Sequence, residues 1–209
     1  MDPVSYSPLA RALAAATGGA VVVPVFAGDL PADRTGERAA AAVSAASALP
    51  GAPERWLLAG HSMGGRAAAE ALAASLVGRA GSLPEAQVAG IAIMASHVEE
   101  VDVESGMLPS AADLPALIIY GSEDAIVKPH DARKSMHVLP GGCAEICLRG
   151  GNHAFAHYDA SGRAAALGDM WGTDGECPLG QEMQIALAAG AIAALAAKCV
   201  ADAPQARAS

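Results

Sequence analysis

The chain has 209 residues, of which 53% are hydrophobic and 17% charged, and its formal net charge at pH 7 is −9. These values fit one globular domain with a sizeable core, which we expect over residues 1–200, followed by a polar tail over residues 201–209. Because nucleic-acid binding normally requires a basic face, the acidic balance argues against a nucleic-acid partner.

Strand and helix patterns alternate along the chain. Short aliphatic or β-branched runs indicate strands, and longer runs with apolar residues at helical spacing indicate helices. In chain order the sequence predicts a helix over residues 5–16, a buried strand over 20–25, a helix over 33–48, a strand over 55–59, a helix over 64–78, strands over 88–95 and 116–120, a helix over 129–136, a strand over 144–148 and a long helix from residue 180 onward.

This alternation indicates the α/β fold class. Strands separated by helices form βαβ units, and short apolar strands are typical of a parallel sheet that is covered on both sides. We therefore expect a mostly parallel sheet with helices on both faces. The connections over residues 96–114 and 150–179 are too long and glycine-rich for simple turns.

The sequence indicates neither a membrane span nor a metal site. Residues 185–197 form a stretch of about 13 residues, mostly alanine, whereas a spanning helix needs about 20, so we expect a buried C-terminal helix. The four cysteines lack the paired CxxC spacing of a zinc site, and we expect buried free thiols rather than a disulfide. They are Cys143, Cys147, Cys177 and Cys199.

Residues 58–67 read LAGHSMGGRA and place Ser62 in a GxSxG pattern. This pattern is typical of a nucleophile elbow, in which a serine occupies a tight turn between a strand and a helix. Because Ser62 follows a predicted strand and opens a predicted helix, an elbow is favoured over a structural or phosphate-binding glycine turn. We expect Gly60 and Gly64 to avoid collisions across the turn and Gly65 to let the helix approach the sheet.

Asp124 is the candidate acid, because it closely follows the predicted strand over residues 116–120. Functional residues of a parallel α/β sheet gather at the carboxyl ends of its strands. The alternative is a turn aspartate that accepts hydrogen bonds from its own backbone. Glu123 is the nearest rival, and we expect its side chain to point to the other face.

His153 is the candidate base, because it follows the last predicted strand, over residues 144–148. The alternative is a loop histidine that is exposed or makes a structural hydrogen bond. Of the other histidines, His157 is the one further candidate base, while His61 is expected to be sequestered by the elbow.

The order Ser62, Asp124, His153 predicts a nucleophile, an acid and a base, each placed after a strand. A serine hydroxyl is a poor nucleophile until a histidine nitrogen takes its proton. The histidine in turn needs a buried carboxylate that fixes its tautomer and stabilises the imidazolium.

With these motifs the sequence resembles an α/β hydrolase of the fold-5 type, whose serine elbow is followed by a GGNHA histidine loop. The resemblance implies a catalytic triad of Ser62, Asp124 and His153, hydrolysis of a small-molecule ester-like substrate, and no cofactor. The matching stretches are DPVSYSPLARALA (2–14), RWLLAGHSMGG (55–65), YGSEDAIV (120–127) and GGNHAFAHY (150–158).

The chain departs from the family pattern in two places. After His153 it carries HYDASGRAAALGDMWGTDGE where a glycine-rich, glutamine-containing segment is usual, and it begins where a strand and a Pro-Gly-rich turn usually end. The resemblance implies an oxyanion hole formed by the N–H of Met63 and by an N–H from the loop before the first helix. We therefore expect an N-terminally shortened hydrolase fold, with Met63 as the donor that is present. The resemblance implies that the missing strand would lie in the sheet between the strands predicted over residues 20–25 and 55–59.

The leading prediction is a serine hydrolase that cleaves carboxylic ester, thioester or lactone bonds through an acyl-enzyme on Ser62. The alternative is a catalytically silent binding protein, or a truncated product, that keeps the fold but lacks a complete oxyanion hole. Halide or epoxide chemistry on the same fold needs an acidic nucleophile, which Ser62 does not provide.

Overall fold

Four parallel strands form one sheet in the order β1-β2-β3-β4, which is also their order in the chain. The computed structural model describes residues 3–24, 35–79, 82–99, 108, 113–156 and 177–201. Since all four strands run in one direction, their carboxyl ends lie along one edge of the sheet, as the sequence predicts. The strands are β1 (Trp56–His61), β2 (Val88–Met94), β3 (Ala116–Gly121) and β4 (Ala144–Leu148).

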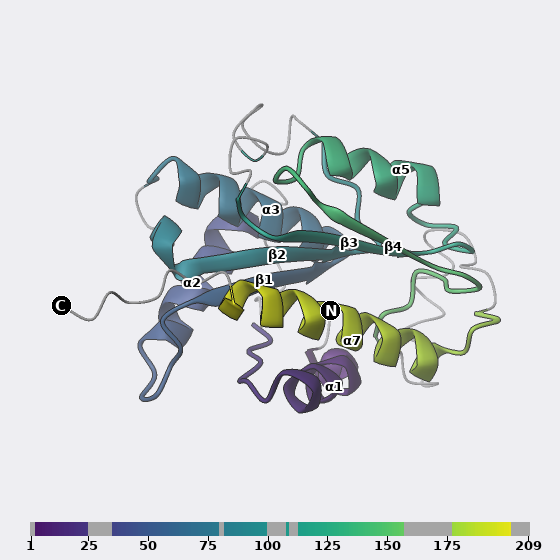
Figure 1. Ribbon diagram of the computed structural model, residues 1–209, viewed down its shortest axis with the longest axis horizontal. Coiled ribbons are helices and arrows are strands. Elements are labelled where there is room, and N and C mark those ends of the chain that lie inside the picture. The colour runs from purple at the N-terminus through teal and green to yellow at the C-terminus, as the bar shows by residue number, and fades with distance from the viewer. Residues whose placement is uncertain are drawn as a thin grey trace.

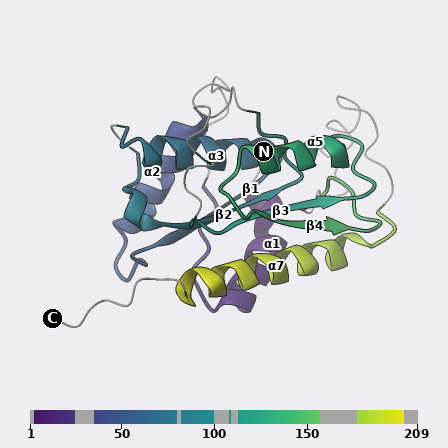
Figure 2. The same ribbon diagram turned by 45° about the horizontal axis from the view of Figure 1, so that its top comes forward.

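Helices cover both faces of this sheet (Figure 1), which confirms the predicted α/β class. The short helix η1 (Pro3–Tyr6) leads into α1 (Ser7–Thr17), which packs beside α7 (Gln181–Ala201) on one face. Figure 2 shows these two helices together on the side of the sheet opposite α3. The other face is covered by α2 (Thr35–Ser47), α3 (Met63–Leu76) and α5 (Pro129–Lys134), which continues as η4 (Ser135–His137), while η3 (Glu85–Gln87) leads into β2.

The central strand β2 shows how the two faces divide the core. Its side chains alternate between faces, as they must in an extended strand. Ile91 and Ile93 pack in the cluster with α2, α3 and α5, whereas Ala92 and Met94 pack in the cluster with α1 and α7. All seven residues of β2 are buried, so this strand is covered on both faces.

The helix predicted over residues 5–16 is confirmed as η1 and α1, and its end follows the glycine signal. Gly18 has φ 65°, a left-handed conformation that glycine adopts at no steric cost. Its N–H donates to the carbonyl oxygen of Ala14 at 2.9 Å and so closes the last turn of α1.

The buried strand predicted over residues 20–25 is wrong for residues 20–24, and residue 25 lies outside the described part of the chain. Residues 20–24 belong to no helix or strand, and Val21 and Val22 are 37% and 44% exposed. A β-branched run becomes a strand only where a neighbouring strand accepts its hydrogen bonds. Within the described residues β1 pairs with β2 alone, so no sheet neighbour holds this run.

The helix predicted from residue 180 onward is confirmed as α7, which extends beyond the apolar stretch over residues 185–197 at both ends. It has 21 residues and a mean hydropathy of 1.8, and it is the one helix among the described residues whose length and composition would allow it to cross a membrane. In this fold it serves as a core helix, because its inner face packs on the sheet through buried residues that include Ile185, Ile192 and Leu195.

The four cysteines are free thiols, as the sequence predicts, but burial was predicted correctly only for Cys199. Cys143 and Cys177 are half-buried, and Cys147 is exposed. Cys147 lies in β4, which is an edge strand of the described sheet and has side chains open to solvent.

Small residues let α3 lie close to the sheet. Its buried face is mostly alanine, and Gly65 lies against Ile93 of β2 and Ser96 just beyond that strand. A Cβ at position 65 would lie 2.5 Å from Ser96 Cβ and 2.6 Å from Ser96 Oγ, so no side chain fits there. Gly65 therefore has the role predicted for it.

We predict that Gly65→Ala lowers the free energy of unfolding by about 1–3 kcal/mol, because the new methyl group overpacks the contact between α3 and Ser96. Gly64→Ala is the matched control, since a Cβ there meets nothing within 4 Å. It should leave stability unchanged or raise it by up to about 1 kcal/mol. Urea denaturation of both variants measures this, and equal effects at the two positions would contradict the packing argument.

Candidate active site

Ser62 occupies a strained turn between β1 and α3. Its backbone has φ 54° and ψ −125°, a conformation that costs a non-glycine residue roughly 1–3 kcal/mol. The turn is fixed on both sides, since Ser62 N–H donates to Met94 O and Gly65 N–H donates to Ser62 O, each at 2.9 Å. This geometry is the strand-turn-helix context that an elbow requires.

Gly60 has the predicted role in this turn, whereas Gly64 does not. A Cβ on Gly60 would collide with the backbone carbonyl of Gly64. A Cβ on Gly64 itself would meet nothing within 4 Å, so the prediction of a collision there is wrong. The turn needs the Gly64 backbone to approach Gly60, and it leaves the side-chain position of Gly64 open.

Asp124 lies just beyond β3 and is buried, with 3% exposure. Its Oδ1 accepts hydrogen bonds from the N–H groups of Ile126 and Val127 at 2.9 and 2.7 Å, so it does cap its own turn. Its Oδ2 is directed at His153. Glu123 is exposed and accepts a hydrogen bond from Ser122 Oγ, which leaves Asp124 as the buried carboxylate at this position.

His153 lies beyond β4, is 6% exposed, and contacts Asp124 through its Nδ1, 3.0 Å from Asp124 Oδ2. A carboxylate can only accept, so His153 Nδ1–H is the donor in this hydrogen bond. Among the contacts of the described residues no hydrogen bond joins Ser62 Oγ to His153. The rival base His157 lies outside the described residues.

The loops that carry Asp124 and His153 are joined through their backbones. Ser122 N–H donates to Leu148 O at 3.0 Å, and Glu123 N–H donates to Gly151 O at 2.8 Å. Gly150 N–H donates to Ser122 Oγ at 2.9 Å. A Cβ on Gly121 would collide with the backbone of Gly151, so the backbones of the two loops touch where they leave the sheet.

Gln184 holds the histidine loop from α7, and sequence reasoning did not find it. It is fully buried, and its Oε1 accepts the N–H of Asn152 at 2.9 Å. Its Nε2 donates to the carbonyl oxygens of Asn152 and Ala154 at 2.9 and 3.2 Å. The signal in the sequence was a glutamine beside Ile185 on the buried face of α7, whose other buried residues are apolar.

His61 lies under the site as a buried neutral ring. Its pKa falls from 6.5 to about 3, first because burial disfavours the charged form and then because His153 lies nearby. The hydrogen bond to the backbone of His153 opposes that shift. His61 is therefore sequestered, as predicted.

Met63 is the first residue of α3, and its side chain is 66% exposed. Backbone N–H groups in the first turn of a helix have no partner within the helix and favour negative charge. The Met63 N–H follows Ser62 directly and so belongs to the first-turn donors. In the described part of the chain no group of three or more His, Cys, Asp or Glu residues is arranged to hold a metal ion.

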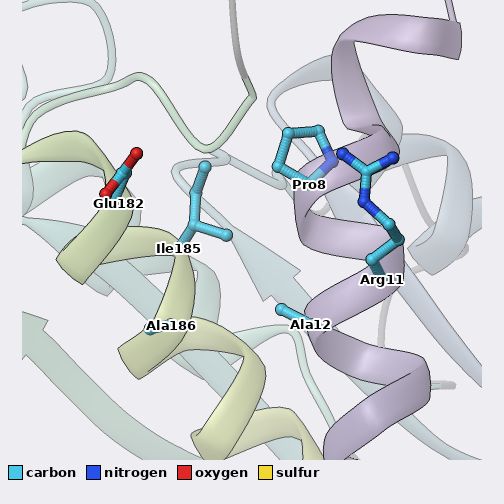
Figure 3. Close-up of a pocket in the computed structure, with 6 residues that line it drawn as sticks. All are labelled: Pro8, Arg11, Ala12, Glu182, Ile185 and Ala186. Atoms are coloured by element: carbon cyan, nitrogen blue, oxygen red, sulfur yellow. The ribbon is translucent and has the colours of Figure 1, made fainter.

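An open hollow of about 440 Å³ lies between α1 and α7, on the helix layer rather than at the strand ends (Figure 3). Its base is apolar, and Arg11 and Glu182 lie on opposite sides of it. It contains none of the residues that carry the candidate chemistry. The lining residues are Pro8, Arg11, Ala12, Glu182, Ile185 and Ala186.

Comparison with known proteins agrees with this fold. The sequence model of the alpha/beta hydrolase family matches residues 1–167. The esterase domain of a Rhodothermus marinus protein is similar in structure, with a TM-score of 0.59 and 16% identity over 94% of this chain and 80% of that one. Zea mays acyl-protein thioesterase 2 has a TM-score of 0.47 and 15% identity over 71% of this chain and 68% of its own. No curated protein matches the chain in sequence.

We predict that Gln184→Met lowers the free energy of unfolding by about 3 kcal/mol, because buried groups on Asn152 and Ala154 lose their partner. Hydrogen exchange of the Asn152 backbone amide should also be faster in Gln184→Met than in wild type. Glu182→Met, a change at an exposed position two residues away, is the control and should alter stability by no more than about 0.5 kcal/mol. An unchanged exchange rate at Asn152 in Gln184→Met would show that the glutamine does not hold the loop.

A second prediction concerns pH. Unfolded His61 binds a proton below pH 6.5, whereas the native residue does so only near pH 3. Its contribution to the free energy of unfolding is therefore complete above pH 6.5 and is lost as the pH falls toward 3, at up to about 1.4 kcal/mol per pH unit. Urea denaturation of wild type and His61→Gln between pH 7 and 4 measures this, and we expect a shallower decline for the variant. Parallel profiles would contradict it.

Proposed function

Because the chain belongs to the alpha/beta hydrolase family, we propose that it is a serine hydrolase that cleaves carboxylic ester, thioester or lactone bonds through an acyl-enzyme on Ser62. The observation that carries the proposal is the buried hydrogen bond between His153 Nδ1 and Asp124 Oδ2 at 3.0 Å. In this proposal His153 acts as the base, at the edge of the sheet where Ser62 follows β1.

In the proposed mechanism His153 Nε2 takes the proton of Ser62 Oγ as the oxygen attacks the substrate carbonyl carbon. The tetrahedral intermediate carries its negative charge on the former carbonyl oxygen, and Asp124 stabilises the imidazolium. As the intermediate collapses, His153 gives its proton to the leaving alcohol or thiol, and an acyl-enzyme remains. Water, deprotonated by His153, then releases the acid and regenerates Ser62.

The Met63 N–H is the proposed oxyanion donor. The strained turn at Ser62 brings that group next to the nucleophile without any rearrangement, because it already points out of the first turn of α3. One such donor typically contributes about 10²–10³ in turnover. The mechanism uses side chains, one backbone N–H and water, and needs no cofactor.

We predict that a fluorophosphonate adds once to the folded chain, on Ser62, because the probe reacts with a serine activated by its histidine. Intact mass and peptide mapping measure the adduct, and Ser62→Ala should give none. If the folded wild type stays unlabelled while a serine hydrolase in the same tube reacts, the proposal fails and the binding-protein alternative replaces it.

The neighbouring carboxylates supply a matched control for the same experiment. Asp124→Asn should slow labelling by roughly 10³–10⁴-fold, since the histidine then loses the partner that sets its tautomer. Glu123→Gln removes the exposed carboxylate one residue away and should leave the rate within about twofold, because exposed charges contribute little at this range. Equal rates for the two variants would contradict the role assigned to Asp124.

A further inference from the structure

A chain of hydrogen bonds runs from the start of α1 to the backbone of the histidine loop. Tyr6 Oη lies 2.8 Å from His61 Nδ1, and His61 Nε2 lies 2.8 Å from the carbonyl oxygen of His153. The three residues come from η1, β1 and the loop after β4, so the chain joins segments that are far apart in sequence. Neither nitrogen of His61 remains for chemistry with a substrate.

The donor and the acceptor of each hydrogen bond in this series follow from one group that can only accept. The carbonyl oxygen of His153 can only accept, so His61 carries its proton on Nε2. The ring is neutral because its pKa is lowered to about 3, and Nδ1 is therefore an acceptor. Tyr6 Oη–H must then be the donor to His61. One tautomer of His61 and one orientation of the Tyr6 hydroxyl satisfy all these groups.

Aromatic contacts fix the ring of His61 in the same position. Its centroid lies 5.8 Å from that of Tyr6 in an edge-on arrangement, 4.9 Å from that of His153 and 5.6 Å from that of Phe155. The ring thus touches the side chain of His153 while it donates to the backbone of the same residue. A movement of His61 would displace both parts of His153.

The histidine loop has two supports, and they act on different residues. Gln184 binds the backbone of Asn152 and of Ala154, on either side of the histidine. His61 binds the carbonyl of His153 itself, which also accepts the N–H of Phe155 at 3.1 Å. The carbonyl contact therefore sets the peptide orientation from which the His153 side chain reaches Asp124.

We propose that His61 and Tyr6 are positioning residues for His153, with Tyr6 holding the tautomer of His61 and His61 holding the backbone of the base. This inference rests on the proposed function, since it assigns the hydrogen-bond chain to the base of that mechanism. The hydrogen bonds then link Tyr6, at the start of α1, to the reactivity of Ser62 through His61 and His153. His61 acts through His153 and exchanges no proton with Ser62 or the substrate.

The test uses three variants of the full chain. His61→Phe keeps a ring but removes both hydrogen bonds, His61→Gln keeps an amide donor for His153 O and an acceptor for Tyr6, and Tyr6→Phe removes only the first link. The fluorophosphonate labelling rate of Ser62 should fall by roughly 10²-fold in His61→Phe and by roughly tenfold in Tyr6→Phe, because small displacements of a reacting group are costly. His61→Gln should restore the rate to within about tenfold of wild type.

Leu195→Ala is the control for a general loss of stability. Leu195 is a buried core residue near the other end of α7, and its truncation should cost about 2–5 kcal/mol without touching the loop. Circular dichroism first establishes that each variant is folded. Labelling of His61→Phe at the wild-type rate would overturn the inference, and so would an equal loss of labelling in Leu195→Ala.

A spectroscopic signal separates this inference from the proposed function. The proton between His153 Nδ1 and Asp124 should give a downfield NMR resonance in wild type and in His61→Gln, and the resonance should broaden or disappear in His61→Phe. If wild type shows the resonance but takes no fluorophosphonate, the proposed function fails and the positioning role is judged from the resonance alone. A resonance that is unchanged in His61→Phe overturns the positioning role, whatever the labelling result.

Discussion

Parallel pairing of β3 with β4, in which Gly121 lies opposite Leu148, sets the distance between the loops that carry Asp124 and His153. Both loops leave the sheet at this pair of residues, and the absence of a Cβ on Gly121 lets their backbones touch. The side chains then need to span only a short gap, which the 3.0 Å hydrogen bond closes. A one-residue slip of this register would turn the side chains of the shifted strand to the opposite face and separate the pair.

Backbone strain collects at the same edge of the sheet. Ser62 with φ 54° and Ala95 with φ 44° are the two non-glycine residues of positive φ in the described part of the chain. They follow His61 and Met94, which lie opposite each other in β1 and β2. The backbone N–H of each of these residues donates to a carbonyl oxygen of the next strand. Ser62 N–H donates to Met94 O at 2.9 Å, and Ala95 N–H donates to Ile119 O at 2.8 Å. The sheet therefore supplies the hydrogen bonds that keep the turn at Ser62 in an unfavourable conformation.

How far the sequence predicts this molecule depends on the range of the interactions involved. Periodicity and glycine signals act over a few residues, and they were sufficient for the α/β class, for the four strands of the sheet and for the placement of Ser62, Asp124 and His153 after strands. Residues 20–24 have the local composition of a strand but no neighbour to pair with in the described sheet. The contacts of Gln184 and His61 with the histidine loop span 32 and 92 positions, and no local pattern encodes them.

The composition of the histidine loop explains why polar side chains hold it. Over residues 151–156 Phe155 is the one large apolar side chain, and Ala156 is the other fully buried apolar residue. The hydrophobic effect is non-directional, whereas a hydrogen bond weakens steeply once its angle or length departs from the optimum. Gln184 and His61 replace apolar anchors with directional ones, and a buried group left without its partner would cost about 1–3 kcal/mol. The geometry of the loop is thereby defined more narrowly than the surrounding core could define it, which is the precision that the proton transfer proposed for His153 requires.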